Sequence, residues 1–277
     1  MKADLHCHSY YSDGAHSPEY LLDRAISRGI THLALTDHDC VEGGLVLRNS
    51  VKPAGLTLID GVEISALWGT VEVHIVGLCI DPLNPALNEV LTTQQQRRYS
   101  RVSEISKAME KADILGLEHY IKKLPCCAPG RRHISEFLIK SGKYNKVKTA
   151  FRQISRGGRF YVPPQWCSLK QAVEAIKIAG GLAILAHPHR YPISKSKMAS
   201  LLTAFSDVKG DGMEVSYSNL DRHIRDTLGE QCAEAGLWAS QGSDFHDQDA
   251  HWMDLGRIDG LPESCKKNAI WLHPGWH

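Results

Sequence analysis

The sequence predicts an α/β fold in which short strands alternate with helices around a parallel sheet or barrel. Short apolar runs, bounded by polar or glycine-containing turns, recur along the chain with room for a helix between them. Such alternation is typical of α/β domains. In addition, histidine and acidic residues follow several of these runs, and the carboxyl ends of barrel strands are where active sites are built.

The expected strands cover residues 3–5, 31–36, 57–59, 71–78, 182–185, 212–215 and 237–240. Residues 17–28 are expected to form a helix, because Ser17 suits the N-cap and Pro18 suits the first helical position. Residues 169–179 form a second expected helix, which the glycines at 180 and 181 would end.

The composition indicates a globular protein with a large core. The chain has 277 residues, of which 43% are hydrophobic and 23% charged, enough for one large domain or a domain with an insertion. No apolar run approaches the roughly 18 to 20 residues of a membrane span, and the first residues lack the apolar core of a signal peptide. We therefore expect a cytoplasmic protein with no membrane partner. The eight cysteines include no Cys-x-x-Cys pair, so we expect buried thiols.

The formal net charge of +1 conceals an uneven distribution. Residues 97–159 contain sixteen Lys or Arg and five Asp or Glu, a net charge of +11, which leaves −10 for the remainder. This basic segment has helical patterns at 97–112 and 134–141 and lacks clear strand patterns. We therefore predict a basic helical insertion domain at 98–163, within a barrel domain formed by 1–97 and 164–277. Such a surface would attract a phosphate chain, although a solvated helix face is the ordinary alternative.

Histidine is abundant, at 15 of 277 residues, and several histidines recur near the ends of the expected strands. His6 and His8 would project to the same face of an extended chain. Each candidate alone has an ordinary explanation; His74, for example, could be a satisfied core histidine. Together they favour a metal centre, because charges clustered in a buried site are costly unless they are paired or bound to a metal.

The metal-ligand candidates are nine residues: His6, His8, Asp13, His38, Glu63, His74, His187, Asp244 and His246. A mixed histidine and carboxylate set favours Mn²⁺, Zn²⁺ or Fe²⁺ over an all-oxygen Ca²⁺ site, and nine ligands suffice for two or three ions. Adjacent ions can lower the pKa of a bridging water and clamp phosphoryl oxygens, so we predict a phosphoesterase that attacks with metal-bridged hydroxide. Asp37 and Asp39 are expected to orient the histidines.

Seven motifs resemble those of the polymerase and histidinol phosphatase (PHP) family, in the family's order and over nearly the whole chain. They lie at 4–9, 12–14, 36–39, 61–65, 74–77, 186–188 and 243–246. Within that family, residues 161–167, 190–191 and 237–243 resemble the TrpH-type members, which include ribonuclease AM and the 3',5'-nucleoside bisphosphate phosphatases.

The resemblance implies a distorted (β/α)7 barrel with a small helical insertion and a trinuclear, usually Mn²⁺-dependent site, with Zn²⁺, Fe²⁺ and Mg²⁺ as alternatives. By analogy, three ligand sets are implied: His6, His8, Glu63 and Asp244; Asp13, His38 and His246; and Glu63, His74 and His187. The implied substrates are RNA with a 5'-monophosphate, shortened from its 5' end, and nucleoside 3',5'-bisphosphates. Both reactions cleave an ester at the 3' oxygen of a 5'-phosphorylated nucleotide.

Three further residues are candidate substrate contacts. Arg131 and His133 match the family's Arg-x-His element; the guanidinium of Arg131 suits bidentate phosphate binding, and His133 could donate a proton to the leaving oxygen. Arg190 follows the His187 motif and is a second phosphate candidate. Many relatives have Gly where His189 stands, so this histidine either lines the pocket or alters a turn.

Two other functions stay open from the sequence. One is a non-catalytic RNA-binding factor that keeps a metal-stabilised barrel, which the complete ligand set disfavours. The other is a small-molecule phosphatase of the histidinol phosphate type. The sequence identifies no protein partner.

Overall fold

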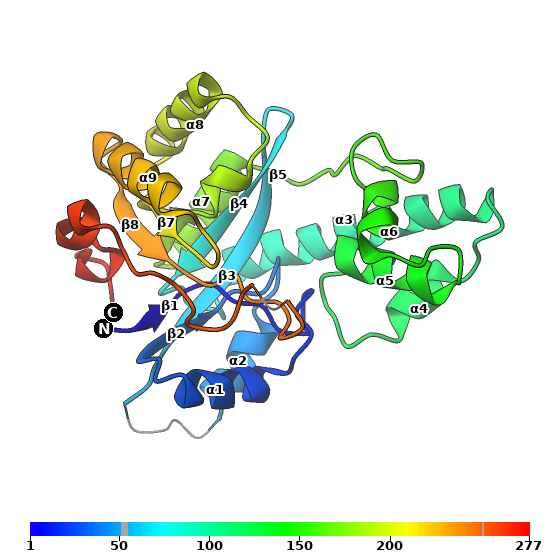
Figure 1. The fold of residues 1–277 in the computed structure, drawn as a ribbon, viewed down its shortest axis with the longest axis horizontal. Helices are drawn as coiled ribbons and strands as arrows, with labels where there is room; N and C mark the ends of the chain where they lie inside the picture. The colour runs from blue at the N-terminus through cyan, green and yellow to red at the C-terminus, as the bar shows by residue number, and fades with distance from the viewer. Residues whose placement is uncertain (51–54, 251) are drawn as a thin grey trace.

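The computed structural model describes residues 1–50, 55–250 and 252–277, and its central feature is one curved sheet that nearly closes into a barrel (Figure 1). The strand order is β1-β2-β3-β4-β6-β7-β8, and β5 pairs with β3. Closure between the two ends relies on a hydrogen bond of 3.2 Å from Leu5 N to Gln241 O and on a bridge between Cys7 and Phe245. The strands are β1 (Ala3–Asp4), β2 (His32–Leu35), β3 (Thr57–Trp68), β4 (Val71–Leu78), β5 (Cys167–Ser168), β6 (Leu182–Leu185), β7 (Gly212–Ser216) and β8 (Trp238–Gln241).

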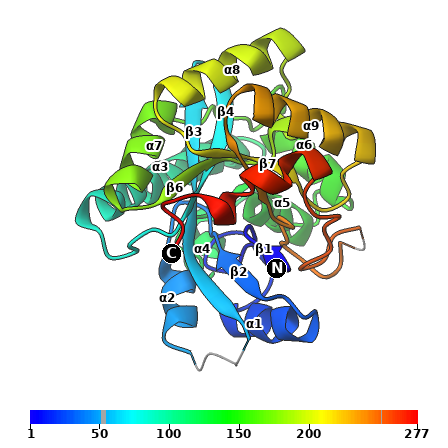
Figure 2. The ribbon, with the colours of Figure 1, turned by 90° about the vertical axis from the view of Figure 1, so that its left-hand side faces the viewer.

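Helices cover the outside of this sheet. α7, α8 and α9 pack over the upper part in the view of Figure 2, and α1 and α2 over the lower part. These helices are α1 (Pro18–Ser27), α2 (Glu42–Arg48), α7 (Leu169–Ile178), α8 (Lys195–Asp207) and α9 (Arg222–Glu234). Short 3-10 helices follow at Pro188–Arg190, Glu263–Asn268 and Ile270–Leu272. None of the helices in the described part of the chain is both long and apolar enough to span a membrane.

The barrel expected from the sequence is confirmed, with three corrections to its strands. β4 runs antiparallel to both β3 and β6, so the sheet is mixed and not parallel. The reason is local: only Gly69 and Thr70 separate β3 from β4, and Gly69 has a φ of +58°, which suits a tight hairpin turn. β3 also continues to Trp68, so that the motif at 61–65 lies inside the strand and does not follow it. The two-residue strand β5 was not predicted.

Four helices form a lobe beside the barrel, to the right in Figure 1. They are α3 (Pro85–Glu110), α4 (Leu117–Lys122), α5 (Arg131–Lys140) and α6 (Val147–Ile154). α3 belongs to both parts, because Leu87 and Leu91 pack in the barrel core whereas Val102 and Ile105 pack in a separate core of the lobe. The boundary predicted between residues 97 and 98 lies within this one continuous helix.

A buried arginine on α3 ties the lobe to the barrel. Arg98, 5% exposed, donates from Nε to Asp39 Oδ2 at 2.7 Å and from Nη2 to Ser65 Oγ at 2.8 Å. Its Nη1 also donates to Pro129 O at 3.3 Å, just before α5 begins. The Asp39 carboxylate therefore accepts hydrogen bonds from Arg98 and, at Oδ1, from the backbone N–H of Ser65. The expectation that it orients a histidine is wrong, because the loop after β2 turns its side chain toward α3.

Removing the arginine of this pair should destabilise the fold. Arg98→Met would leave the Asp39 carboxylate buried without a cation, which costs about 3–5 kcal/mol of unfolding free energy. The double variant Asp39→Asn/Arg98→Met should lose less than the sum of the two single variants. Urea denaturation in EDTA measures these values, with exposed Arg152→Met as the matched control, expected within about 0.5 kcal/mol of the parent. Additive effects would contradict the pairing.

Candidate metal centre

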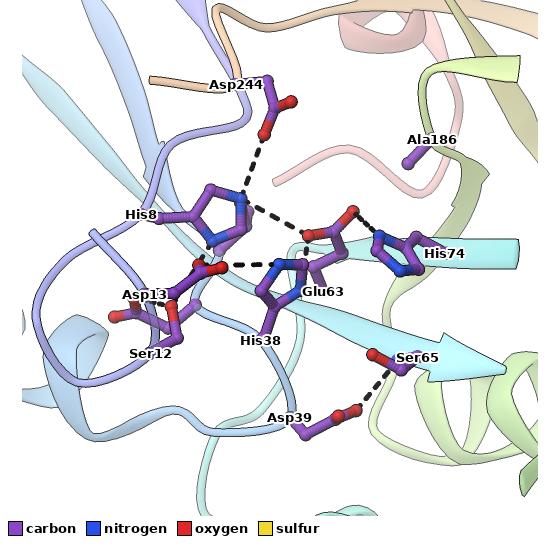
Figure 3. Close-up of polar contacts among 12 residues, drawn as sticks. His8, Ser12, Asp13, His38, Asp39, Glu63, Ser65, His74, Ala186 and Asp244 are labelled. Carbon is purple, nitrogen blue, oxygen red and sulfur yellow. Dashed lines mark hydrogen bonds and ion pairs between the residues drawn. The ribbon is translucent and has the colours of Figure 1, made fainter. Parts of the chain in front are cut away.

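The structure brings all nine predicted ligand residues to one end of the barrel. His6, His8 and Asp13 follow β1, and His38 follows β2. Glu63 and His74 lie within β3 and β4, where the antiparallel pairing places them on neighbouring strands. The segments after β6 and β8 supply the other three: His187, Asp244 and His246. Figure 3 shows several of these side chains pointing toward one another.

The carboxylate of Glu63 lies at the middle of the cluster and is fully buried. Oε2 is 2.8 Å from His38 Nδ1 and 3.3 Å from Nε2 of both His6 and His8. Oε1 is 3.0 Å from His74 Nδ1 and 3.1 Å from His187 Nε2. His74 thus faces the cluster, and the ordinary explanation of a core histidine does not apply to it.

Two aspartates complete the cluster on the opposite side from His74. Asp13 Oδ1 is 3.2 Å from His246 Nε2 and 3.6 Å from His38 Nε2. Asp244 Oδ1 is 3.2 Å from His8 Nε2 and 3.5 Å from His6 Nε2. Every histidine of the cluster therefore has a carboxylate within 3.6 Å.

Among the described residues, donor atoms within 4.8 Å of one another form four overlapping groups that could hold metal ions. These are His8, Asp13, His38 and His246; His6, Glu63 and His187; His6, His8 and Asp244; and His38, Glu63 and His74. In these groups Glu63 lies with His187 and with His74 separately, whereas the family resemblance implied one set containing all three. The overlap through His6, His8, His38 and Glu63 is the arrangement expected of adjacent ions that share ligands.

Several donor atoms of the cluster have no hydrogen-bond partner in the described part of the chain and are suited to bind cations. Within the described residues, buried atoms without a hydrogen-bond partner include Asp13 Oδ1, His38 Nδ1, Glu63 Oε2 and His187 Nδ1. The Nε2 atoms of His6 and His8 are only 3.0 Å apart. Native proteins seldom leave buried polar atoms unpaired, so this many in one place indicates an electrophile that completes the site.

The charges of the cluster suit metal binding. Burial opposes ionisation of Asp13, Glu63 and Asp244, yet neighbouring cationic groups hold each pKa well below its ordinary value. Burial and repulsion from His246 and His38 lower the pKa of His8 to about 3, so this ring is a neutral ligand at pH 7. Although burial opposes it, Asp13 and Asp244 raise the pKa of His246 to about 9, so metal binding must displace its proton.

A carboxylate that sequence reasoning missed orients two of the ligands. Glu214 Oε1 accepts a hydrogen bond from His6 Nδ1 at 2.7 Å, which leaves Nε2 of that ring facing the cluster. Its Oε2 accepts from the backbone N–H of His187 at 2.6 Å, where the backbone has an unusual φ of +29°. The available signal was a lone acidic residue in the apolar strand 212–215. Glu214 is 1% exposed.

Asp37 supports the ligands less directly than expected. Its two carboxylate oxygens accept hydrogen bonds from Ser9 N, Ser9 Oγ and Ser12 Oγ at 2.6 to 2.7 Å. Ser12 Oγ is in turn 3.4 Å from His8 Nδ1. Asp37 therefore shapes the loop between His8 and Asp13, and reaches a histidine only through a serine.

The three predicted substrate contacts make different interactions. Arg131 places its guanidinium 5.4 Å from the ring centre of Phe151. His133 accepts a hydrogen bond at Nδ1 from Gly130 N at 3.0 Å, so that Nε2 carries the proton. Burial lowers the pKa of His133, although Asp13 opposes this effect. Arg190 pairs with Asp244 and lies over the ring of Tyr217.

Arg132, and not Arg131, connects the lobe to the ligand loops. Its Nη1 donates to the carbonyl oxygens of Asp13 at 3.2 Å and His246 at 3.4 Å. Its Nη2 pairs with Asp247, and Nε pairs with Glu136 on its own helix. The sequence alone did not separate the two neighbouring arginines, because the choice depends on which side of α5 faces the barrel.

The fold agrees with comparisons to known proteins. The PHP domain model matches residues 4–157, and the chain belongs to this family. It is 41% identical to the 5'-3' exoribonuclease Rnm of Escherichia coli, over 97% of this chain and 92% of the relative. It is 38% identical to the 3',5'-nucleoside bisphosphate phosphatase of Chromobacterium violaceum, over 97% of this chain and 94% of the relative.

Two solved structures are similar over nearly the whole chain. An amidohydrolase from Chromobacterium violaceum, solved with bound sulfate, has a TM-score of 0.89 and 36% identity, covering 98% of this chain and 95% of its own. A candidate metal-dependent phosphoesterase from Bifidobacterium adolescentis has a TM-score of 0.79 and 26% identity, covering 96% and 94%. The family resemblance found in the motifs is therefore confirmed.

Replacing Glu214 should weaken metal binding without unfolding the barrel. In Glu214→Gln, the amide can still accept from His6 but presents N–H groups to the His187 amide. Loss of such an outer partner lowers metal affinity about 10- to 100-fold. Chelator competition measures the affinity, and Glu230→Gln on the exposed face of α9 is the matched control. An affinity equal to that of the control would contradict the orienting role.

Proposed function

We propose that the protein is a metal-dependent phosphoesterase that hydrolyses 3'-phosphate esters of 5'-phosphorylated nucleotides. The observation that carries this proposal is the buried Glu63 carboxylate within 3.3 Å of five histidine nitrogens, two aspartates completing the donor set. The substrates are RNA, shortened from its 5' end, and nucleoside 3',5'-bisphosphates. Two relatives of about 40% identity are named for these two activities, which supports the assignment.

The nine clustered residues are proposed to hold two or three divalent ions, with Mn²⁺ as the expected metal. Their donors are imidazole nitrogens and carboxylate oxygens, a set that suits Mn²⁺, Zn²⁺ and Fe²⁺. Ions bound there would activate a water for attack and neutralise charge on the phosphoryl oxygens. Glu63 belongs to two of the neighbouring donor groups and so could contribute a ligand to ions in both.

Three further residues are proposed to contact the substrate. Arg131 makes no ion pair with a described residue, so its planar guanidinium is available to bind a phosphate through two hydrogen bonds. His133 keeps its proton on Nε2 and is influenced by the charge of Asp13, so this N–H could donate a hydrogen bond to the leaving 3' oxygen, whose proton would come from a water because a neutral imidazole is too weak an acid to supply it. Arg190 is the proposed second phosphate contact, and its guanidinium lies beside Asp244 of the donor set.

Removing one ligand should abolish turnover while the protein stays folded. His6→Ala and Asp244→Ala each delete a donor from the centre of the cluster, and the loss of several kcal/mol of transition-state stabilisation corresponds to about 100-fold or more in rate. Activity is assayed with Mn²⁺ on adenosine 3',5'-bisphosphate, and circular dichroism checks folding. His223→Ala, exposed on α9, is the matched control. Full activity of metal-free enzyme would contradict the proposal.

The 5'-phosphate requirement can be tested on matched substrates. A 5'-phosphorylated oligoribonucleotide should be cleaved about 10- to 100-fold faster than its 5'-hydroxyl counterpart, the value of a charge-assisted hydrogen bond. Histidinol phosphate, assayed beside them, should react more slowly than adenosine 3',5'-bisphosphate. Equal rates on the two oligoribonucleotides would rule out a 5'-phosphate pocket. Tight RNA binding without release of any product would instead favour a non-catalytic RNA-binding factor.

A further inference from the structure

A groove of about 300 Å³ runs where α3 leaves the barrel, against the segment that returns from the lobe to β5. Its lining is polar, with two arginines and one acidic residue. The residues are Thr93, Gln96, Arg97, Ser100, Arg101, Glu104, Val162, Pro163 and Gln165. None of them belongs to the proposed metal centre or to its substrate contacts.

The two arginines of the groove lack carboxylate partners. Arg97 donates from Nη1 to Gln94 Oε1 at 2.8 Å, and Arg101 donates from Nε to Val162 O at 3.0 Å. Neither forms an ion pair with any residue the structure describes, so each keeps donors for an anion. Burial lowers the pKa of Arg101, the nearby Glu72 opposes this effect, and repulsion from Arg131 and Arg98 adds to it. Glu104 is the one acid in the lining of the groove, against two arginines.

A series of side-chain contacts links the groove to the strand that carries His74. The guanidinium of Arg101 lies 5.7 Å from the ring centre of Trp166, whose Nε1 donates to Glu72 Oε1 at 2.8 Å. Glu72 is two residues before His74 on β4, so both side chains project from the same face of that strand. Arg131 and Arg101 both stabilise the ionised form of Glu72. A chain leaving the metal centre past Arg131 would therefore reach Arg101 and then Arg97.

We propose that this groove binds the RNA strand on the 3' side of the scissile bond, through phosphates held by Arg101 and Arg97. The inference rests on the proposed phosphoesterase function and extends it. A nucleoside bisphosphate has only two phosphates, one attacked and one held by its 5'-phosphate contacts, so it has none for two further arginines. A single strand supplies one at each nucleotide, and the surrounding segment 97–159 carries a net charge of +11. The groove thus favours polymeric substrates.

Binding without turnover tests the groove directly. The probe is a 5'-phosphorylated decaribonucleotide with a 3' fluorophore, its anisotropy measured in EDTA over a range of salt concentrations. Arg97→Ala should raise the Kd about 3- to 10-fold and reduce the slope of log Kd against log salt by about 0.7, the loss of one phosphate contact on a single strand. Arg222→Ala, an 85% exposed arginine on α9, removes the same charge elsewhere and should leave both values nearly unchanged. An Arg97→Ala variant indistinguishable from this control would overturn the proposal.

Measurements of turnover then distinguish a loss of binding in the groove from a loss of function at the metal centre. With Mn²⁺, Arg97→Ala should reduce kcat/KM on a 5'-phosphorylated pentaribonucleotide about 3- to 10-fold and change it less than twofold on adenosine 3',5'-bisphosphate. The variant Arg97→Ala/Arg101→Ala should extend the loss on the pentaribonucleotide. Equal losses on both substrates would overturn the assignment to the 3' strand. Failure of the parent enzyme on both substrates would contradict the proposed function instead, and the binding experiment would still decide whether the groove holds RNA.

Discussion

The structure depends on one buried negative charge, the carboxylate of Glu63. A fully buried carboxylate is very unfavourable in a protein interior unless charge and hydrogen bonds compensate it. Here the compensation comes from histidines on four separate parts of the chain: the segments after β1, β2 and β6, and strand β4. The barrel is the arrangement that brings these segments to one point. The packing, the loop conformations and the chemistry at this end of the sheet therefore all depend on compensating the charge of Glu63.

The helical lobe is joined to that centre by two arginines with different roles. Arg98 holds the loop after His38 through Asp39 and the start of α5 through Pro129. Arg132 holds the backbone of the loops that carry Asp13 and His246. Because both anchors lie within a few residues of ligand positions, the lobe cannot shift without disturbing the metal centre. This coupling fixes the position of His133 relative to Asp13, whose charge acts on the pKa of His133.

The groove on α3 adds a third element to this arrangement. The same helix packs Leu87 in the barrel, buries Arg98 at the junction and places the half-buried Arg97 and Arg101 in the groove. Because an α-helix has 3.6 residues per turn, neighbouring positions on α3 face the barrel core, the junction with the lobe and the groove. The clustered positive charge of the groove destabilises the isolated protein through repulsion, and it becomes favourable when a phosphate chain is bound. The net charge of +1 for the whole chain reveals none of this.

The sequence by itself determined the positions of seven of the strands, though not the full length of β3, together with the helical character of the insertion and the identity of the nine residues that the structure brings together. These follow from local periodicity and from short motifs, which a linear chain displays directly. Tertiary structure decided the direction of β4, the central place of Glu63, the turn of Asp39 toward Arg98 and the choice of Arg132 as anchor. It also revealed Glu214, which lies 208 residues from His6 in the chain and 2.7 Å from it in space. Such contacts depend on how the sheet curves and closes, because residues so far apart in the sequence meet only after the strands between them have paired.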